Sequence, residues 1–249
     1  MPAFCIVIPA RMRSERLPGK PLCELAGRPM IQHVQERGWA SGADRVIVAT
    51  DDERVAAAAR DGGGEALLTR EDHATGTDRI AEVAGCLEMA DDAILVNLQG
   101  DEPLMPPALL RCAAEDLAAH PDASIATLAT PIGSETLDNP NEVKVVFDHA
   151  GYALYFSRAP IPWPRDGVEA PPVTTPWRRH LGIYAYRARF LRRFPTLAVP
   201  TLEEMERLEQ LRALWHGYRI HITTVDVPPE AGVDTPEDLD RVAARMSNP

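Results

Sequence analysis

Residues 45–60 read RVIVATDDERVAAAAR, and this stretch decides the fold class. Its first six residues form an apolar, β-branched run that predicts a strand, and the alanine-rich remainder, 51–60, predicts a helix. The same alternation continues on both sides, with strands expected at 4–8, 66–69, 93–98 and 124–130 and helices near 30–37, 77–89 and 107–119. Strands that alternate with helices predict an α/β fold, with a mostly parallel sheet, right-handed crossovers, and helices on both faces.

The second half of the chain has a different pattern. Residues 143–147 and 152–156, joined by DHAG, predict a β-hairpin. Apolar runs then predict two more strands, at 181–186 and 218–227. Helical spacing predicts two amphipathic helices, at 202–215 and 235–246. Residues 158–176 hold six prolines, which indicates a mobile loop or an arm packed on a partner.

Composition limits the class of protein. The 249 residues are 45% hydrophobic, which suits one domain with a sizeable core. The four cysteines form no C-x-x-C pair and no ligand cluster with the seven histidines, so we expect a reduced, cytoplasmic chain without zinc. A formal net charge of -11 argues against general nucleic-acid binding, and neither a signal peptide nor a membrane span is predicted.

Three polar segments follow the expected strands, at 9–20, 51–52 and 99–103. In parallel sheets, ligands bind beyond the carboxyl ends of the strands. The first segment, PARMRSERLPGK, is basic and is suited to phosphate groups, although a solvated loop explains its charge about equally well. It is neither a Walker A loop nor a G-x-G-x-x-G fingerprint. The absence of the second motif makes an NAD oxidoreductase a remote alternative.

Two aspartates are candidate magnesium ligands. Asp101 lies in QGDEP after the apolar strand 93–98, where a turn is the simpler explanation. Asp234 lies in GVDTP, where a helix N-cap is the simpler explanation. Residues 73–79, HATGTDR, would either cradle a base or ribose or cap the helix that follows.

Taken together, these segments resemble one enzyme family, the 3-deoxy-manno-octulosonate cytidylyltransferases, or CMP-Kdo synthetases. LPGKPL and QGDEP are shared with the wider sugar-nucleotidyltransferase superfamily, whereas YFSRAPIPW (155–163), RHLGIY (179–184) and LEQLRALW (208–215) are much more specific to the Kdo enzymes. The resemblance covers nearly the whole chain. It implies a Rossmann-like, three-layer nucleotidyltransferase fold with a smaller β-rich part. The chain would be a single domain. Its nucleotide-binding part would be residues 1–130 and 220–249, and its sugar-acid-binding and homodimer-forming part would be residues 131–219.

The resemblance also implies a reaction and residue roles. CTP and Kdo would give CMP-Kdo and diphosphate with Mg²⁺, which activates Kdo for lipopolysaccharide biosynthesis. The catalytic residues would be Arg11, Lys20, Asp101 and Asp234, of which the two aspartates bind the metal. The CTP contacts would be Ala10, Arg11, Ser14, Lys20, Thr75, Gly76, Thr77 and Arg79. The Kdo contacts would be Gln99, Arg158, His180, Tyr184, Glu209 and Gln210.

Each sugar contact also has a plainer explanation in the sequence. Arg158 would be a surface charge, His180 a hydrogen-bonded strand residue, and Glu209 with Gln210 the polar face of a leucine-rich helix. The chain departs from the family pattern at residues 12–15, where Glu15 would repel a triphosphate unless it points away, and at Thr75, where serine is usual. Alternatives are a related enzyme for 8-amino-Kdo, sialic acid or a hexose phosphate, and a non-catalytic nucleotide sensor on the same fold.

Overall fold

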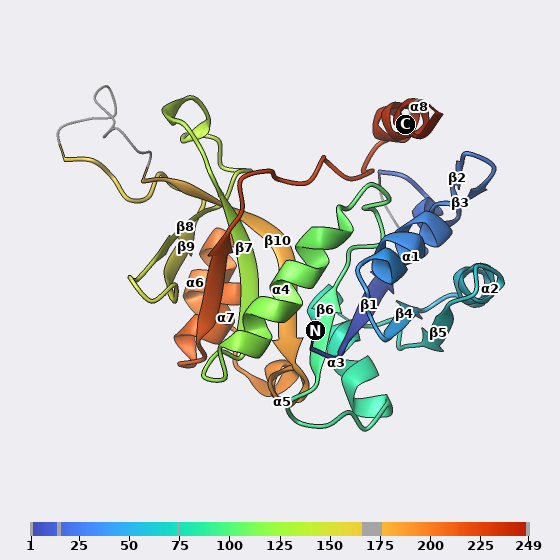
Figure 1. The fold of residues 1–249 in the computed structure, drawn as a ribbon, viewed down its shortest axis with the longest axis horizontal. Helices are drawn as coiled ribbons and strands as arrows, with labels where there is room; N and C mark the ends of the chain where they lie inside the picture. The colour runs from blue at the N-terminus through green and yellow to red at the C-terminus, as the bar shows by residue number, and fades with distance from the viewer. Residues whose placement is uncertain (1, 14–15, 74, 166–175, 248–249) are drawn as a thin grey trace.

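The structure is a computed structural model that describes residues 2–13, 16–73, 75–165 and 176–247 (Figure 1). Its centre is a nine-stranded mixed sheet in the order β11-β7-β10-β6-β1-β4-β5, to which β8 and β9 are added beside β10. The strands of this sheet are β1 (Phe4–Ala10), β4 (Arg45–Thr50), β5 (Glu65–Leu68), β6 (Ile94–Asn97), β7 (Ile125–Pro131), β8 (Lys144–Phe147), β9 (Ala153–Ser157), β10 (Arg178–Arg187) and β11 (Ile220–Thr224). The short pair β2 (Glu24–Leu25) and β3 (Arg28–Pro29) stands apart.

The first half of the chain builds the parallel part of the sheet, as the alternating pattern predicts. β1 pairs in parallel with β4 and β6, and β4 pairs in parallel with β5. One face packs on α1 (Met30–Ala40), α2 (Glu53–Asp61) and α4 (Pro107–Ala119), and the other packs on α3 (Gly76–Cys86) and α5 (Ala188–Arg193) (Figure 1). The predicted three-layer α/β fold is confirmed.

β10 makes the sheet mixed, because it runs antiparallel between β6 and β7. Its pairing with β7 is interrupted between Leu181 and Tyr184, so two residues of β10 have no partner in the register. The hydroxyl of Thr127 on β7 fills this gap, because its one proton is shared between the carbonyls of Leu181 (3.1 Å) and Ile183 (2.7 Å). The irregularity lies where β10 passes the carboxyl end of β6, and it therefore shapes the rim of the site described below.

The prediction of one helix across 202–215 is wrong. The structure has two short helices, α6 (Thr201–Glu206) and α7 (Gln210–Trp215), separated by Arg207 in the left-handed conformation with φ 54°. The turn changes the direction of the chain. As a result Leu208 and Leu211 reach the core, while Met205 and Trp215 of the same spacing pattern are exposed.

The last helix, α8 (Pro236–Ser247), matches its prediction within one residue. The four cysteines are free thiols, and burial raises the pKa of Cys5 on β1 to about 12, so this thiol packs as a small buried hydrophobe. Within the described ranges, no helix combines the length and apolarity needed to span a bilayer. The middle of the proline-rich segment, 166–175, lies outside the described residues.

Candidate active site

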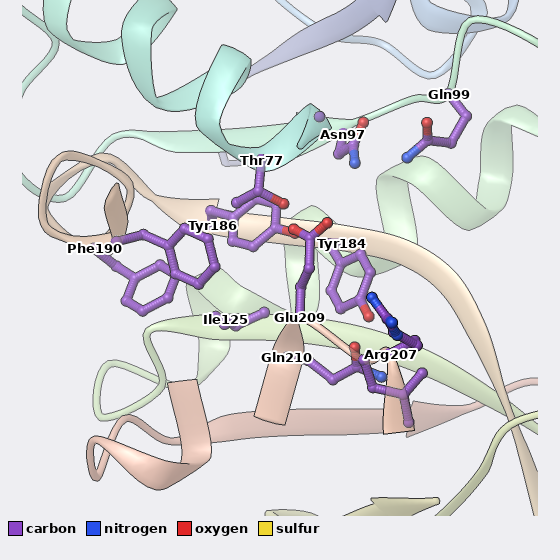
Figure 2. A pocket seen from close by; sticks show the side chains of 13 residues that line it. Thr77, Asn97, Gln99, Ile125, Tyr184, Tyr186, Phe190, Arg207, Glu209 and Gln210 are labelled. Atoms are coloured by element: carbon purple, nitrogen blue, oxygen red, sulfur yellow. The ribbon is translucent and has the colours of Figure 1, made fainter. Parts of the chain in front are cut away.

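Two adjoining cavities lie at the carboxyl ends of β1 and β6. The basic cavity, of about 240 Å³, is lined by Pro9, Ala10, Arg11, Arg13, Lys20, Pro21, Gly76, Gln99, Gly100 and Asp101. The polar cavity, of about 330 Å³, is lined by Gly76, Thr77, Asn97, Gln99, Ile125, Tyr184, Tyr186, Phe190, Phe194, Arg207, Leu208, Glu209 and Gln210 (Figure 2). Both walls include Gly76 and Gln99, so the cavities meet at the start of α3 and the end of β6.

Lys20 joins the two predicted magnesium ligands in the basic cavity. Its ammonium donates to the carboxylates of Asp101 (2.8 Å) and Asp234 (3.0 Å), and Lys20 is largely buried. Burial lowers the pKa of Lys20, but the hydrogen bonds and charges of Asp101 and Asp234 outweigh it and leave the pKa raised. Two carboxylates thus converge on one cation. Because hard oxygen donors that share one cation suit Mg²⁺, the donor set fits this metal.

The chain brings these aspartates together from opposite ends of the sequence. The amide of Val233 donates to the carbonyl of Asp101 (2.8 Å), which places residue 234 beside the QGDEP turn. A Cβ atom on Gly232 would lie 2.8 Å from that carbonyl oxygen, so the close approach requires glycine. The sequence showed each motif but not this contact between them.

The simpler explanation of Asp234, that it is the N-cap of the following helix, is wrong, because Thr235 is the residue that caps α8. The Thr235 hydroxyl accepts from the amide of Asp238 (3.2 Å), and the Asp238 carboxylate accepts from the amide of Thr235 (3.1 Å). The Asp234 carboxylate is therefore free to face Lys20 and Arg16, whose guanidinium lies 3.1 Å away. Ser14 and Glu15 lie outside the described residues.

Residues 75–79 have two different functions in the structure. Thr75 caps α3 by accepting from the amide of Asp78 (3.2 Å), while Gly76 and Thr77 line the polar cavity. Arg79 lies outside both cavity walls. It is fully buried, and its guanidinium donates to Asp51 (2.9 Å) and to the hydroxyl of Thr69, which ties α3 to the ends of β4 and β5.

The polar cavity collects four of the six predicted sugar contacts, Gln99, Tyr184, Glu209 and Gln210 (Figure 2). Burial raises the pKa of Glu209, although Thr77 and Thr75 hydroxyls partly offset this by donating hydrogen bonds to its carboxylate. Two buried acceptor oxygens, Asn97 Oδ1 and Glu209 Oε2, have no hydrogen-bond partner among the described residues. Because unpartnered buried acceptors cost free energy, the wall is suited to a ligand rich in hydroxyl or amino donors.

Arg158 and His180 do not line the polar cavity. The guanidinium of Arg158 donates to the carbonyls of Glu206 (2.7 Å) and Pro140 (2.8 Å). His180 bonds to the hydroxyl of Thr127 (3.0 Å) and packs against the rings of Phe156 and Tyr184. Burial lowers the pKa of His180 to about 3, so its imidazole is neutral at neutral pH and can donate one N–H.

Sequence reasoning missed three polar residues of the cavity wall, Asn97, Tyr186 and Arg207. Asn97 is a polar residue inside an otherwise apolar strand, which is a signal that the sequence does contain. Tyr186 lies two residues after Tyr184 on β10 and therefore points to the same side of the sheet. Arg207 had no such signal, because the leucine spacing predicted a continuous helix there.

A second cluster of possible metal ligands, Asp116, His120 and His221, lies between α4 and β11. The two imidazole rings are stacked, with centroids 3.5 Å apart and an interplanar angle of 16°. An ion must lie near the plane of every imidazole that coordinates it, and two parallel stacked planes share no such point. The Asp116 carboxylate lies 2.8 Å from His221 Nδ1 and 3.1 Å from His120 Nδ1. The cluster is therefore a hydrogen-bonded network that links α4 to β11.

A mostly parallel sheet, a basic loop after its first strand and two aspartates that share a cation form the arrangement expected of a nucleotidyltransferase. The model of the cytidylyltransferase family matches residues 5–220, and the chain belongs to this family.

Two close relatives agree with this assignment. The chain is 58% identical to the 3-deoxy-manno-octulosonate cytidylyltransferase of Halorhodospira halophila (strain DSM 244 / SL1), over 99% of this chain and 98% of that protein. It is 44% identical, with a TM-score of 0.90 and 99% of each chain covered, to the structure of a CMP:2-keto-3-deoxy-manno-octonic acid synthetase complexed with CTP. A cytidylyltransferase from Leptospira borgpetersenii serovar Hardjo-bovis (strain JB197), 16% identical with a TM-score of 0.65 and coverage of 98% and 87%, shares the fold.

Proposed function

We propose that this cytidylyltransferase transfers the cytidylyl group of CTP to 3-deoxy-D-manno-octulosonate (Kdo), which gives CMP-Kdo and diphosphate. The observation that carries the proposal is the pair of cavities that meet at Gly76 and Gln99. One is lined by Arg11, Arg13 and Lys20, and the other is lined by polar groups that include two unpartnered acceptor oxygens. The relatives named for Kdo and for CTP support the choice of substrates.

In this proposal the basic cavity binds the triphosphate. Arg11 and Lys20 would bind phosphate oxygens, with Ser14 and the main chain at Ala10 beside them, and the N-terminus of α3 at Gly76 would add its dipole. Thr75, Thr77 and Arg79 would support the cytidine. For Arg79 this support would be indirect, through Asp51 and Thr69, because the structure buries its side chain.

The polar cavity would bind the sugar acid through Gln99, Tyr184, Glu209 and Gln210. The hydroxyl groups of Kdo would donate to the unpartnered oxygens of Asn97 and Glu209. Arg158 and His180 would border this site from the 131–219 part of the chain. There Arg158 would exchange a bond to a backbone carbonyl for one to the substrate.

The transfer is an in-line displacement at the α-phosphorus. The anomeric oxygen of Kdo forms the new P–O bond, its proton passes to solvent, and the bond from the α-phosphorus to the leaving diphosphate breaks. Asp101 and Asp234 would hold Mg²⁺. When bound, the metal would neutralise triphosphate charge and favour ionisation of the attacking hydroxyl. The residues of the two cavities then contribute mainly by holding the two reactants in line.

The test is release of diphosphate by the purified chain with CTP, Mg²⁺ and Kdo, compared with ATP, GTP and UTP and with sialic acid and sugar phosphates. Release that needs CTP, Kdo and the metal together is the expected result, and EDTA should abolish it. Release with another acid instead of Kdo would overturn the substrate assignment, and CTP binding without release for any acceptor would indicate a nucleotide sensor.

A further inference from the structure

The segment that carries Asp234 has no regular structure of its own. Residues 225–235, VDVPPEAGVDT, connect β11 to α8 and belong to no helix or strand (Figure 1). Pro228 and Pro229 have no amide hydrogen to donate, and the other backbone groups find no partners in a helix or a sheet. The position of Asp234 is therefore set by the side chains and distant backbone groups that hold the residues around it.

Arg241 on α8 holds the backbone directly before Asp234. Its Nη2 atom donates to the carbonyls of Ala231 (2.9 Å) and Gly232 (3.0 Å) and to one carboxylate oxygen of Asp238 (3.1 Å). The two hydrogens of this nitrogen are shared among the three acceptors. The other carboxylate oxygen of Asp238 accepts from the amide of Asp234 (3.1 Å). Two paired side chains of α8 thus hold the carbonyls on one side of this short stretch and the amide at its end.

α8 is itself fixed to the elements that form the basic cavity. The residue after Arg241, Val242, is fully buried in an apolar cluster that also contains Leu17, Met30 and Val233. Leu17 belongs to the basic loop and Met30 begins α1. The helix that carries Arg241 is therefore anchored to the same loop whose lysine pairs with the two aspartates.

The stretch that Arg241 holds lies against the QGDEP turn. The amide of Val233 donates to the carbonyl of Asp101 (2.8 Å), and a Cβ atom on Gly232 would lie 2.8 Å from the same oxygen. Arg241 and Asp101 thus contact neighbouring peptide groups from different sides. If the guanidinium were removed, the carbonyls of 231 and 232 would be free to turn, and the Asp234 carboxylate could move away from that of Asp101.

We propose that Arg241 is a positioning residue for the metal site, because it holds the backbone that keeps the Asp234 carboxylate beside that of Asp101. The inference rests on the proposed function, since it takes these two aspartates as the metal ligands. Arg241 lines neither cavity, so it acts through the backbone and not on a substrate. Mg²⁺ requires its ligands close to an octahedral geometry, so a mobile Asp234 would weaken metal binding more than binding of either substrate.

Three variants separate the hydrogen bonds of Arg241 from its charge. Arg241→Gln removes the guanidinium, and Arg241→Lys retains the charge with an ammonium that can donate to a carbonyl. Arg245→Gln is the matched control, because it removes an arginine from the same helix whose ion pair is with the side chain of Glu230 (3.5 Å). Both arginines are exposed, so we expect all three variants to fold, and thermal unfolding checks this.

Two measurements are made on each protein. Hydrogen exchange of the peptide that contains Val233 is followed by mass spectrometry on the chain without substrates or metal, and it reports how firmly the stretch before Asp234 is held. Diphosphate release is then measured over a range of Mg²⁺ concentrations at saturating CTP and Kdo, and again at saturating Mg²⁺ with varied Kdo.

We expect Arg241→Gln to speed the exchange and to raise the Mg²⁺ concentration for half-maximal activity about tenfold, the effect of losing one charged hydrogen bond. KM for Kdo and kcat at saturating Mg²⁺ should stay close to the wild-type values. Arg241→Lys should recover part of both changes, and Arg245→Gln should match wild type.

A purely structural contact would give a different result. A lower melting temperature or faster exchange in Arg241→Gln with an unchanged Mg²⁺ dependence would overturn the inference, and so would an equal effect of Arg245→Gln, which would indicate the charge of α8 alone. A wild type that uses another acid would overturn the proposed substrate but not this inference, which would be tested with that acid. A wild type that releases diphosphate with no acceptor would overturn both.

Discussion

At the scale of single residues, the decisive group is Lys20 between Asp101 and Asp234. Replacing either aspartate by asparagine removes one of two negative charges from a largely buried ammonium and one of two proposed metal ligands. We expect Asp101→Asn and Asp234→Asn each to lower kcat at least about 100-fold, since electrostatic groups at the reacting centre have effects of that order. The melting temperature should change little, because Lys20 keeps its second partner.

The measurement is diphosphate release over a range of Mg²⁺ concentrations, together with thermal unfolding. Asp122→Asn is the matched control, since Asp122 is an exposed aspartate outside the site whose carboxylate lies 3.6 Å from the guanidinium of Arg219. Turnover close to wild type in both site variants would rule out the metal assignment.

His180 gives a prediction about stability and pH. Burial lowers its folded-state pKa to about 3, whereas an unfolded imidazole has a pKa of about 6.5. Between these values the unfolded chain binds more protons than the folded chain, so stability is fully present above pH 6.5 and is lost as the pH falls towards 3. His180 as a whole residue is only partly buried, so we expect a slope below the ideal of about 1.4 kcal/mol per pH unit.

His180→Gln lacks this titration. The free energy of unfolding of wild type and variant should be measured by chemical denaturation between pH 4.5 and 7.5, and the advantage of wild type should shrink as the pH falls. The difference between the two proteins is the correct quantity, because burial also raises the pKa of Glu102, to about 8, and this acts in the opposite sense. A difference that does not vary with pH would contradict a buried neutral imidazole.

At the scale of elements, α6 and α7 depend on one buried ion pair. Arg212 Nε on α7 donates to the carboxylate of Glu203 on α6 (2.7 Å), and both side chains are about nine-tenths buried. Arg212→Met would leave Glu203 charged and unpaired, so we expect a loss of about 3–5 kcal/mol in the free energy of unfolding. The double variant Glu203→Met with Arg212→Met should recover most of it.

Chemical denaturation of both single variants and the double variant tests this coupling. Arg45→Met, which removes the exposed pair with Glu65 on β5, is the control and should cost no more than about 1 kcal/mol. Equal losses for Arg212→Met and Arg45→Met would show that the link between α6 and α7 is not held by this pair.

The two helices also show where sequence reasoning reaches its limit. The strand and helix pattern of the first half predicted the layers, because a periodic apolar pattern records burial against a neighbouring layer. The leucine spacing across 202–215 did not record the turn at Arg207, since that turn is imposed by contacts of Glu206 with Ser157 and Arg158, about 50 residues earlier. Long-range contacts of this kind have no local signal.

The same reason explains which parts of the site were predictable. Gln99 and Asp101 follow the end of β6 closely, and Lys20 lies in the segment that follows β1, so the topology places all three near one edge of the sheet. The approach of Asp234 depends on the contact of Val233 with Asp101, and the exclusion of Arg158 from the cavity wall depends on the carbonyls of Glu206 and Pro140. Residue identity indicated which groups matter, but only the folded chain shows which of them face the same space.

At the scale of the whole molecule, large apolar side chains lie exposed in the 131–219 part. Leu154, Trp163, Met205 and Trp215 are each more than 60% exposed. They belong to β9, α6, α7 and the segment after β9, all on the side of the molecule away from β5 (Figure 1). Burying such side chains against a second copy would be favourable, because removal of apolar surface from water stabilises an interface. We therefore expect the chain to form a homodimer through this part.

Light scattering and sedimentation of the whole chain should give twice the monomer mass, and Leu154→Asp with Trp163→Ser should shift the protein towards the monomer. Leu68→Asp on β5 is the matched control, because it places the same charge on an exposed leucine at the opposite edge of the sheet and should leave the dimer intact. The residues that line the basic cavity lie between Pro9 and Asp101, outside the 131–219 part, so the monomeric variant should retain CTP binding even if turnover falls. A wild type that is monomeric at all concentrations, or a control that dissociates equally, would place the interface elsewhere or exclude it.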